Sequence, residues 1–319
     1  MRTRSLLNDS LLLTTAAIWG FAFVAQRVGM DHIGPFTYNG IRFLLGASIL
    51  VPVALWLSPL YRIRVLPTIG AGIVAGSALF IAASLQQIGL VYTTAGNAGF
   101  ITGLYVVLVP IIGIGRRQKI GSARWLAVAL AVVGLWFLSV SNDFRINPGD
   151  IFVIGSAFFF AAHVQLIDHL APRYSALWLS LVQYVLVGIL SLTVGGIFET
   201  FEPNALRNAL PAILYGGIGS ISIAYTLQVV AQRDAEPIHA AIILSLEGSF
   251  AALGGWLLLG EVLTLRGLLG CALLLAGMLL SQLSGILRGD AAAGVEATPV
   301  PGTVEPHVTG GYRASGDSR

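Results

Sequence analysis

Long apolar runs, separated by short polar or Pro/Gly-containing breaks, recur along this sequence as far as about Arg288. Each run has about 20 residues, which as a helix can cross the roughly 30 Å of hydrocarbon in a bilayer. Only 10% of the 319 residues are charged, whereas soluble domains carry roughly 25%. We therefore predict an all-α membrane protein.

Ten of these runs are predicted to be transmembrane helices. They are residues 10–29, 35–57, 66–90, 93–114, 122–139, 149–169, 174–197, 208–230, 236–258 and 263–285. Only "VYTTAGN" divides the third from the fourth, so nine is the alternative count. The first run follows Arg2 and Arg4, as a secretory signal does, but it continues to Gly29 without a clear cleavage site. We expect a retained helix there.

The distribution of basic residues predicts the orientation, because short cytoplasmic loops collect Arg and Lys. With the amino terminus inside, most basic residues fall on the inner side. The outer side then holds only Arg27, Arg145, Arg207 and Arg266. Both termini are therefore predicted to be cytoplasmic, with the chain in the cell (inner) membrane. The excess of basic residues is explained by this topology and does not indicate nucleic-acid binding.

An internal repeat is also predicted. A shift of about 140 to 142 residues superimposes "AIWGFAFVAQ" on "AFFFAAHVQL", and "AGNAGFITGLYVVLVP" on "PIHAAIILSLEGSFAA". Each unit would have five helices, and an odd number inverts the second unit in the membrane. We predict a first repeat over 1–141, a second over 149–286 and a disordered cytoplasmic tail over 287–319. The alternative is that membrane segments rich in Leu, Ala and Gly align by composition alone.

Several segments resemble the EamA family of the drug/metabolite transporter (DMT) superfamily. They include "AAIWGFAFVAQRVG", "SLQQIGLVYTTAGNAGFITGLYVVLVPIIG" and "AAIILSLEGSFAALGGWLLLGEVLT", of which "GGWLLLGEVLT" is the most specific. The resemblance covers nearly all of the chain before the tail. It implies ten helices in two inverted five-helix repeats, and export of amino acids or other metabolites. It also implies that the first, third and fourth helices of each repeat surround a central cavity.

The sequence departs from the pattern of this family at two points. Gly248 follows Glu247, where the family usually has proline, and the first repeat ends in "IGIGRRQK" without a matching "GE". These departures concern the region around Glu247 and leave the expected fold unchanged.

Two charged residues lie deep inside predicted spans. Of the 15 acids, only Glu247 falls near the middle of a span. A buried carboxylate without a cation favours its protonated form, which would suit it to carry protons or to attract a substrate ammonium. The alternative is a neutral side chain hydrogen-bonded between helices. Arg42 is the only deep cation; we expect an ion pair to a neighbouring helix, with substrate-carboxylate binding as the alternative.

Helical spacing and the repeat shift group the other candidates. Trp19, Phe23 and Gln26 share one face of the first span, and Asn97 and Tyr105 share one face of the fourth. The shift carries polar or aromatic residues of the first half onto similar ones in the second, such as Tyr105 onto Glu247. The predicted substrate-binding residues are Trp19, Phe23, Gln26, Gln86, Asn97, Tyr105, His163, Tyr225, Gln228, His239 and Glu247. For each residue alone, helix packing is an equally good interpretation.

Missing motifs exclude several classes of protein. Lys119 is the only lysine and follows Gln118, so the chain has no phosphate-binding Gly-Lys-Ser/Thr loop and no intramembrane Schiff-base lysine. No hydrolase motif is present, and the spacing of His163, Asp168 and His169 is not that of a metal site.

We therefore predict a secondary transporter that works by alternating access and is not an enzyme. Its partners would be a small-molecule solute and the lipid bilayer, with proton coupling as an option and with no cofactor, metal or nucleic acid. Uniport, import, nucleotide-sugar-type exchange and a non-transporting membrane scaffold are the alternatives.

Overall fold

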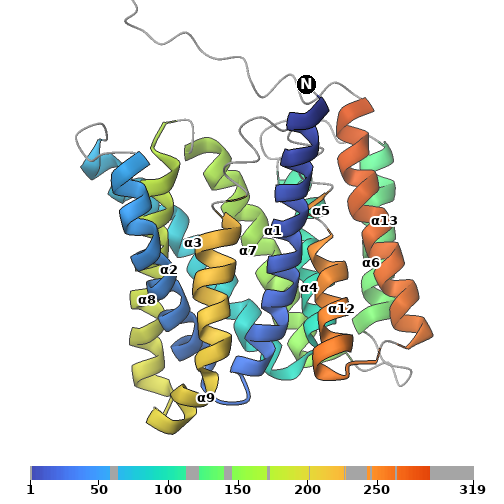
Figure 1. The fold of residues 1–319 in the computed structure, drawn as a ribbon. Helices are drawn as coiled ribbons and strands as arrows, with labels where there is room; N and C mark the ends of the chain where they lie inside the picture. The colour runs from blue at the N-terminus through green and yellow to red at the C-terminus, as the bar shows by residue number, and fades with distance from the viewer. Residues whose placement is uncertain are drawn as a thin grey trace, which may run out of the picture.

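A computed structural model of the chain describes residues 2–57, 64–112, 122–139, 146–170, 173–200, 202–225, 227, 243–244, 246–262 and 264–287. These residues form a bundle of helices (Figure 1). The helices are α1 Arg2–Gly29, α2 Pro35–Leu57, α3 Val65–Tyr92, α4 Ala95–Gly103, α5 Tyr105–Ile112, α6 Ser122–Ser139, α7 Pro148–Leu170, α8 Ala176–Phe198, α9 Pro203–Leu214, the π-helix η3 Tyr215–Ala224, α12 Glu247–Leu259 and α13 Leu265–Leu287.

Five of the described helices are long and apolar enough to cross a membrane. They are Asp9–Gly29 within α1, the whole of α2, α3 and α8, and Pro148–Ile167 within α7. Shorter apolar helices cover Ala95–Val109, Trp125–Leu138 and Leu265–Leu280. The prediction of an all-α, multi-pass membrane protein is thus confirmed. The count of ten spans, the inversion of the second half and the cytoplasmic termini stay predictions, and the predicted tail from Arg288 lies outside the described residues.

The core of the bundle lies between helices from the two halves of the sequence. α2 packs along α8, α4 along α12, and α6 along α13, while α3 contacts both α7 and α8. α1 runs through the middle of the bundle and contacts α12 and η3 (Figure 1). Large apolar side chains such as Trp56 and Leu66 are more than 80% exposed, as expected where the surrounding solvent is lipid.

Small residues bring these helices close together. Gly134 of α6 and Gly270 of α13 face one another, and a Cβ atom on Gly134 would lie 2.8 Å from the Gly270 carbonyl oxygen. Lipid does not drive apolar helices together as water does, so close backbone packing supplies much of the attraction between them. α6 and α13 contact each other at one edge of the bundle and depend on this packing (Figure 1).

The ten residues of η3, "YGGIGSISIA", form a π-helix, a rare and wider form that often occurs at functional sites. Its backbone receives hydrogen bonds from other helices: the Trp19 Nε1–H donates to the Ser220 carbonyl at 3.1 Å. In the other direction, the Tyr215 hydroxyl donates to the Ile18 carbonyl at 3.0 Å. These bonds attach η3 to α1.

We expect Gly134→Ala to lower the free energy of unfolding by about 1–3 kcal/mol, because the added methyl group cannot avoid the α13 backbone. Gly70→Ala is the matched control, since nothing lies within 4 Å of the Cβ position at Gly70. Denaturant or thermal unfolding in detergent measures both variants. Equal stability of the two would contradict the close packing of α6 on α13.

Candidate functional site

The described helices are interrupted by single turn residues at Leu104 and at Leu246. α4 ends at Gly103 and α5 begins at Tyr105, whereas α12 begins at Glu247 after a turn at Leu246. At the first interruption the Leu104 N–H donates to the Ile101 carbonyl at 3.1 Å, and at the second the Leu246 N–H donates to the Ile243 carbonyl at 3.1 Å. The two turns are separated by the same repeat shift that carries Tyr105 onto Glu247.

Tyr105 and Glu247 follow these turns directly, one in each half of the chain. Only 6% of Glu247 is exposed, and no described residue donates a hydrogen bond to its carboxylate. The sequence predicted Glu247 within a continuous span, whereas α12 begins at this residue. The carboxylate therefore lies in the first turn, where unpaired N–H groups and the helix dipole favour negative charge.

α1 forms the wall beside Glu247. A Cβ atom on Gly20 would lie 2.7 Å from the Glu247 carbonyl oxygen, so only glycine permits this approach. Phe23, one turn further along α1, is 4% exposed and belongs to the same hydrophobic cluster that Tyr105 packs against. Phe23 and Tyr105 thus pack in or against one hydrophobic cluster, and the backbone of Glu247 lies against α1.

A second polar cluster joins α7, α8 and the residue after η3. His163 Nε2 lies 2.6 Å from Gln183 Oε1, and the Ser180 hydroxyl donates to the Tyr225 hydroxyl at 2.5 Å. The rings of Tyr184 and Tyr225 meet edge to face with centroids 5.9 Å apart. His163 and Tyr225 were predicted. Ser180, Gln183 and Tyr184 were missed, although their spacing in "SLVQY" puts them on one helix face.

A third cluster contains the glutamines of α3. Gln86 Nε2 donates to Thr102 Oγ1 at 3.0 Å, and Gln87 Nε2 donates to the Gln26 carbonyl at 3.2 Å. The side-chain carbonyl oxygens of Gln26 and Gln87 are buried and have no hydrogen-bond partner in the described part of the chain. Buried acceptors of this kind need a donor, which water or a solute can supply. The prediction included Gln26 and Gln86 and missed Gln87.

The remaining predicted residues have other positions. The indole N–H of Trp19 donates to the η3 backbone. Trp19 can therefore offer a solute its aromatic face but no hydrogen bond. The Asn97 N–H bonds to the capping hydroxyl of Thr94 at 3.1 Å, and the Asn97 side chain is half-buried. Gln228 and His239 lie outside the described residues.

Arg42 is held by its own helix and by aromatic rings. Its Nε–H donates to Asn39 Oδ1 at 3.0 Å, and its guanidinium lies 5.3 Å from the Tyr38 ring centroid and 5.2 Å from that of Phe43. The ion pair expected from the sequence has no acidic partner among the described residues. Cation–π contacts stabilise the buried charge in its place.

At the end of the bundle opposite the amino terminus, carboxylates join helices from the two halves. Glu199 accepts hydrogen bonds from the N–H groups of Phe36 and Thr37 at 2.8 and 2.7 Å, at the start of α2. Glu261 accepts from those of Ala95 and Gly96 at 2.7 and 3.1 Å, at the start of α4.

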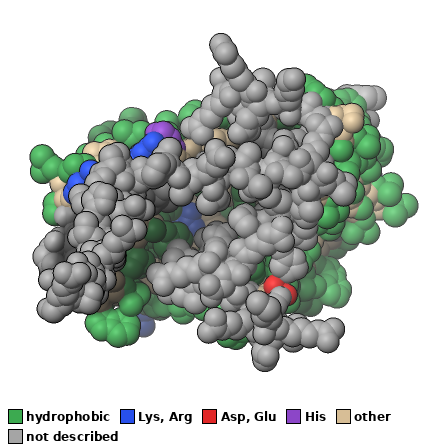
Figure 2. All heavy atoms as spheres, turned by 90° about the horizontal axis from the view of Figure 1, so that it is seen from above, with side chains coloured by type: hydrophobic (Ala, Val, Ile, Leu, Met, Phe, Trp, Pro, Cys, Tyr) green, Lys and Arg blue, Asp and Glu red, His purple; other side chains and the backbone are tan. Residues whose placement is uncertain are grey.

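These carboxylates accept hydrogen bonds from helix N–H groups that have no partner within the helix. One of them, Glu261, belongs to "GGWLLLGEVLT", the most specific segment of the sequence resemblance, so this segment contains the cap of α4. Asp150 also bonds to Thr93 at this end. Figure 2 looks onto the end bearing the amino terminus, where the described side chains in view are mostly hydrophobic.

Within the described residues, no three His, Cys, Asp or Glu side chains come close enough together to hold a metal ion. The chemistry that the clusters offer is therefore hydrogen bonding, aromatic contact and one buried carboxylate.

Apolar spanning helices around interrupted helices with inward-facing polar groups define a multi-pass membrane transporter. The model of the EamA-like transporter family matches the chain twice, over residues 6–140 and 147–283. The chain belongs to this family.

Known relatives agree with this assignment. An "uncharacterized transporter" of Archaeoglobus fulgidus is 32% identical over 88% of this chain and 87% of its own length. A "probable amino-acid metabolite efflux pump" of Salmonella typhimurium is 24% identical over 84% of this chain and 92% of its own. A solved crystal structure shares the fold with a TM-score of 0.61 at 17% identity, covering 88% of this chain and 98% of that one.

We expect Glu261→Ala to speed amide hydrogen exchange at Ala95 and Gly96, because it removes the only described acceptor of these two N–H groups. Loss of a helix cap lowers stability by about 0.5–2 kcal/mol. Glu202→Ala is the control, since Glu202 is exposed and its side chain caps no helix. Unchanged exchange in Glu261→Ala would show that the carboxylate does not hold the start of α4.

Proposed function

We propose that this protein is a secondary transporter that exports a small amino-group-bearing metabolite by alternating access. The observation that carries the proposal is the pair of matching interruptions that begin at Tyr105 and Glu247. Interrupted helices at corresponding positions of two repeats typically form the substrate site near the bilayer midplane. α4, which ends just before Tyr105, packs on α12, which begins at Glu247.

Two inverted repeats, over residues 1–141 and 149–286, are part of the proposal. The double match of the family model supports them. The helix contacts support them as well, because several of the main contacts have a counterpart when the halves are exchanged. α3 with α7 corresponds to η3 with α1, α3 with α8 to η3 with α2, and α1 with α12 to α7 with α4. A two-fold axis in the membrane plane would produce this exchange.

The carboxylate caps at the end opposite the amino terminus support alternating access. Glu199 and Glu261 join helices of the two halves at this end. With the amino terminus in the cytoplasm, as the basic residues predict, the carboxylates face outward. Opening to the outside then requires Glu199 and Glu261 to release the four backbone N–H groups that they bind at the starts of α2 and α4.

Glu247 favours a substrate that carries an ammonium group. It is buried and has no cationic partner among the described residues, and an unpaired buried carboxylate strongly prefers a positive partner or a proton. Phe23 and Tyr105 supply aromatic faces beside it, and the unpaired oxygens of Gln26 and Gln87 accept hydrogen bonds. An amino acid or a related amine fits this chemistry. The name of the Salmonella relative points the same way.

A large anionic solute, such as a nucleotide sugar, fits less well. Arg42 is the only cation deep in a predicted span, and its Nε–H and its guanidinium face are used by Asn39, Tyr38 and Phe43. Proton coupling through Glu247 is compatible with export, because a carboxylate can carry a proton in the half-cycle without substrate.

Counterflow of labelled amino acids in proteoliposomes, with and without a pH gradient, tests the proposal. We expect Glu247→Gln to lower the rate of amine counterflow by about 10- to 100-fold, which corresponds to the roughly 1.5–3 kcal/mol of a charge-assisted hydrogen bond. Glu202→Gln removes an exposed acid and should leave the rate unchanged.

An unchanged rate and pH response in Glu247→Gln would refute the role of this residue. Loss of the response to a pH gradient with normal counterflow would assign Glu247 to proton coupling instead of substrate recognition. Failure of the wild-type protein to move any of the amino compounds would refute the proposed substrate class.

A further inference from the structure

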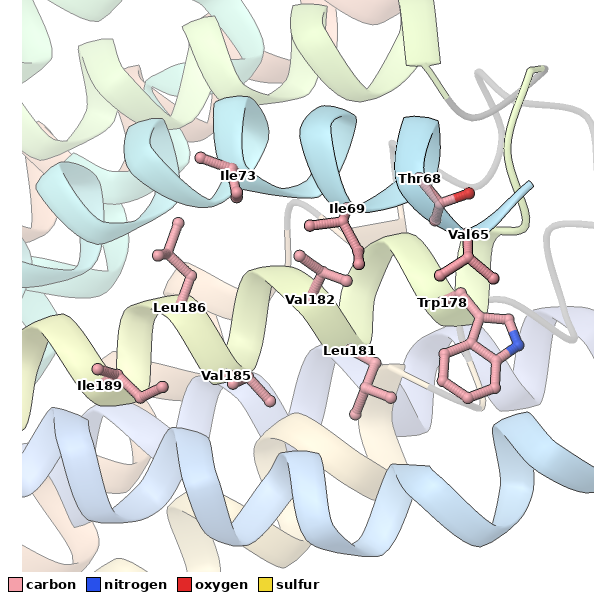
Figure 3. Close-up of a pocket in the computed structure, with 10 residues that line it drawn as sticks. All are labelled: Val65, Thr68, Ile69, Ile73, Trp178, Leu181, Val182, Val185, Leu186 and Ile189. Atoms are coloured by element: carbon pink, nitrogen blue, oxygen red, sulfur yellow. The ribbon is translucent and has the colours of Figure 1, made fainter. Parts of the chain in front are cut away.

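A continuous apolar groove runs along the outer side of the bundle between α3 and α8 (Figure 3). Its volume is about 350 Å³, within the range of small-molecule sites. Val65, Ile69 and Ile73 line it from α3, and Trp178, Val182 and Ile189 line it from α8. The one lining residue with a hydroxyl, Thr68, donates it to the Arg64 carbonyl at 2.7 Å. The groove therefore offers no free hydrogen-bonding group.

The groove is open to the membrane. α3 and α8 approach closely at Gly72, where an added Cβ would collide with the side chain of Val182. Outside this contact the side chains diverge: Val65, Ile69, Ile73 and Ile189 are 40–53% exposed. In a helix bundle surrounded by lipid, such a furrow is filled by an apolar chain, because an empty furrow loses dispersion contacts.

One end of the groove carries positive charge. Arg64 immediately precedes Val65, and its Nη2 donates to the Arg173 carbonyl at 3.5 Å. The Arg173 guanidinium in turn donates to the His169 carbonyl at 2.6 Å. Both arginines are exposed, and neither forms an ion pair within the described residues. Trp178 lies at this same end (Figure 3), as expected for an aromatic residue at the lipid headgroup level.

The length of the groove matches one leaflet. Trp178 and Ile189 are eleven residues apart on α8, which is about 16 Å at the rise of an α-helix. Half of the hydrocarbon thickness is roughly 15 Å. The groove therefore begins at the headgroup level and ends near the bilayer centre, as a single acyl chain does.

We propose that the groove binds an acyl chain of an anionic phospholipid whose phosphate contacts Arg64 and Arg173. The lipid then joins α3, from the first half of the chain, to α8, from the second. It belongs to the leaflet at the end of the bundle that carries the amino terminus. This site is independent of the proposed solute and of the direction of transport.

Native mass spectrometry of the purified full-length protein, incubated with mixed micelles of phosphatidylglycerol and phosphatidylcholine, tests the site. We expect the wild type to retain phosphatidylglycerol preferentially. Arg64→Gln/Arg173→Gln should reduce this preference by about 30-fold, which is about 2 kcal/mol for two juxtamembrane charges. Arg27→Gln/Arg207→Gln removes the same charge at the opposite end and should keep the preference of the wild type.

A second variant tests the groove itself. Ile69→Trp fills it and should abolish lipid retention, whereas Ile151→Trp, at a position that is 55% exposed on α7, should not. Thermal unfolding establishes that each variant is folded.

An unchanged lipid preference in Arg64→Gln/Arg173→Gln would overturn the proposal, as would unchanged retention in Ile69→Trp. So would a dimer that dissociates in Ile69→Trp, because it would show that a second copy of the chain covers the groove.

Discussion

The structure depends on one constraint: within hydrocarbon, every backbone polar group and every charge must find its partner inside the protein. Helices satisfy this requirement along their length but leave N–H groups free at each start. At the starts of α2 and α4, carboxylates from distant parts of the sequence fill this need. Arg42 meets the same requirement with an amide oxygen and two aromatic rings. At the two helix starts, stability thus comes from contacts between the two halves, whereas Arg42 is stabilised within its own helix.

The same constraint explains where the candidate site lies. An interruption in a spanning helix frees backbone groups, which is tolerated only inside the protein. At Leu104 and Leu246 the helical hydrogen-bond pattern tightens, with the N–H and carbonyl groups of both residues still bonded, and Tyr105 and Glu247 follow them directly. The unpaired oxygens of Gln26 and Gln87 add acceptors that the described residues leave unused. Burying each of these groups without a partner costs free energy. A solute that supplies the missing partner removes this cost, and the gain stabilises the bound state.

The sequence predicted features that depend on local pattern. Long apolar runs predicted the five helices that are long enough to cross a membrane, while the repeat shift that relates Tyr105 to Glu247 stays a prediction. The sequence could not predict the helix cap formed by Glu261. The partner of Glu261, Ala95, lies 166 positions away, and only the packing of the helices brings the two residues together. The contact of His163 with Gln183 depends on the register of α7 against α8, which periodicity does not specify. Arg42 was expected to need an acid, and a single sequence does not reveal that two rings could replace it.

The π-helix η3 has a consequence for the second polar cluster. A π-helix contains more residues in each turn than an α-helix, and its hydrogen bonds can shift by one position without breaking the chain. Each residue of an α-helix turns the chain by about 100°. If a turn of η3 tightened by one residue, Tyr225, which follows it directly, would swing around the helix axis by roughly that angle. Its hydroxyl would leave Ser180 and its ring would leave Tyr184, so a local winding change in one span would reshape the lining contributed by another.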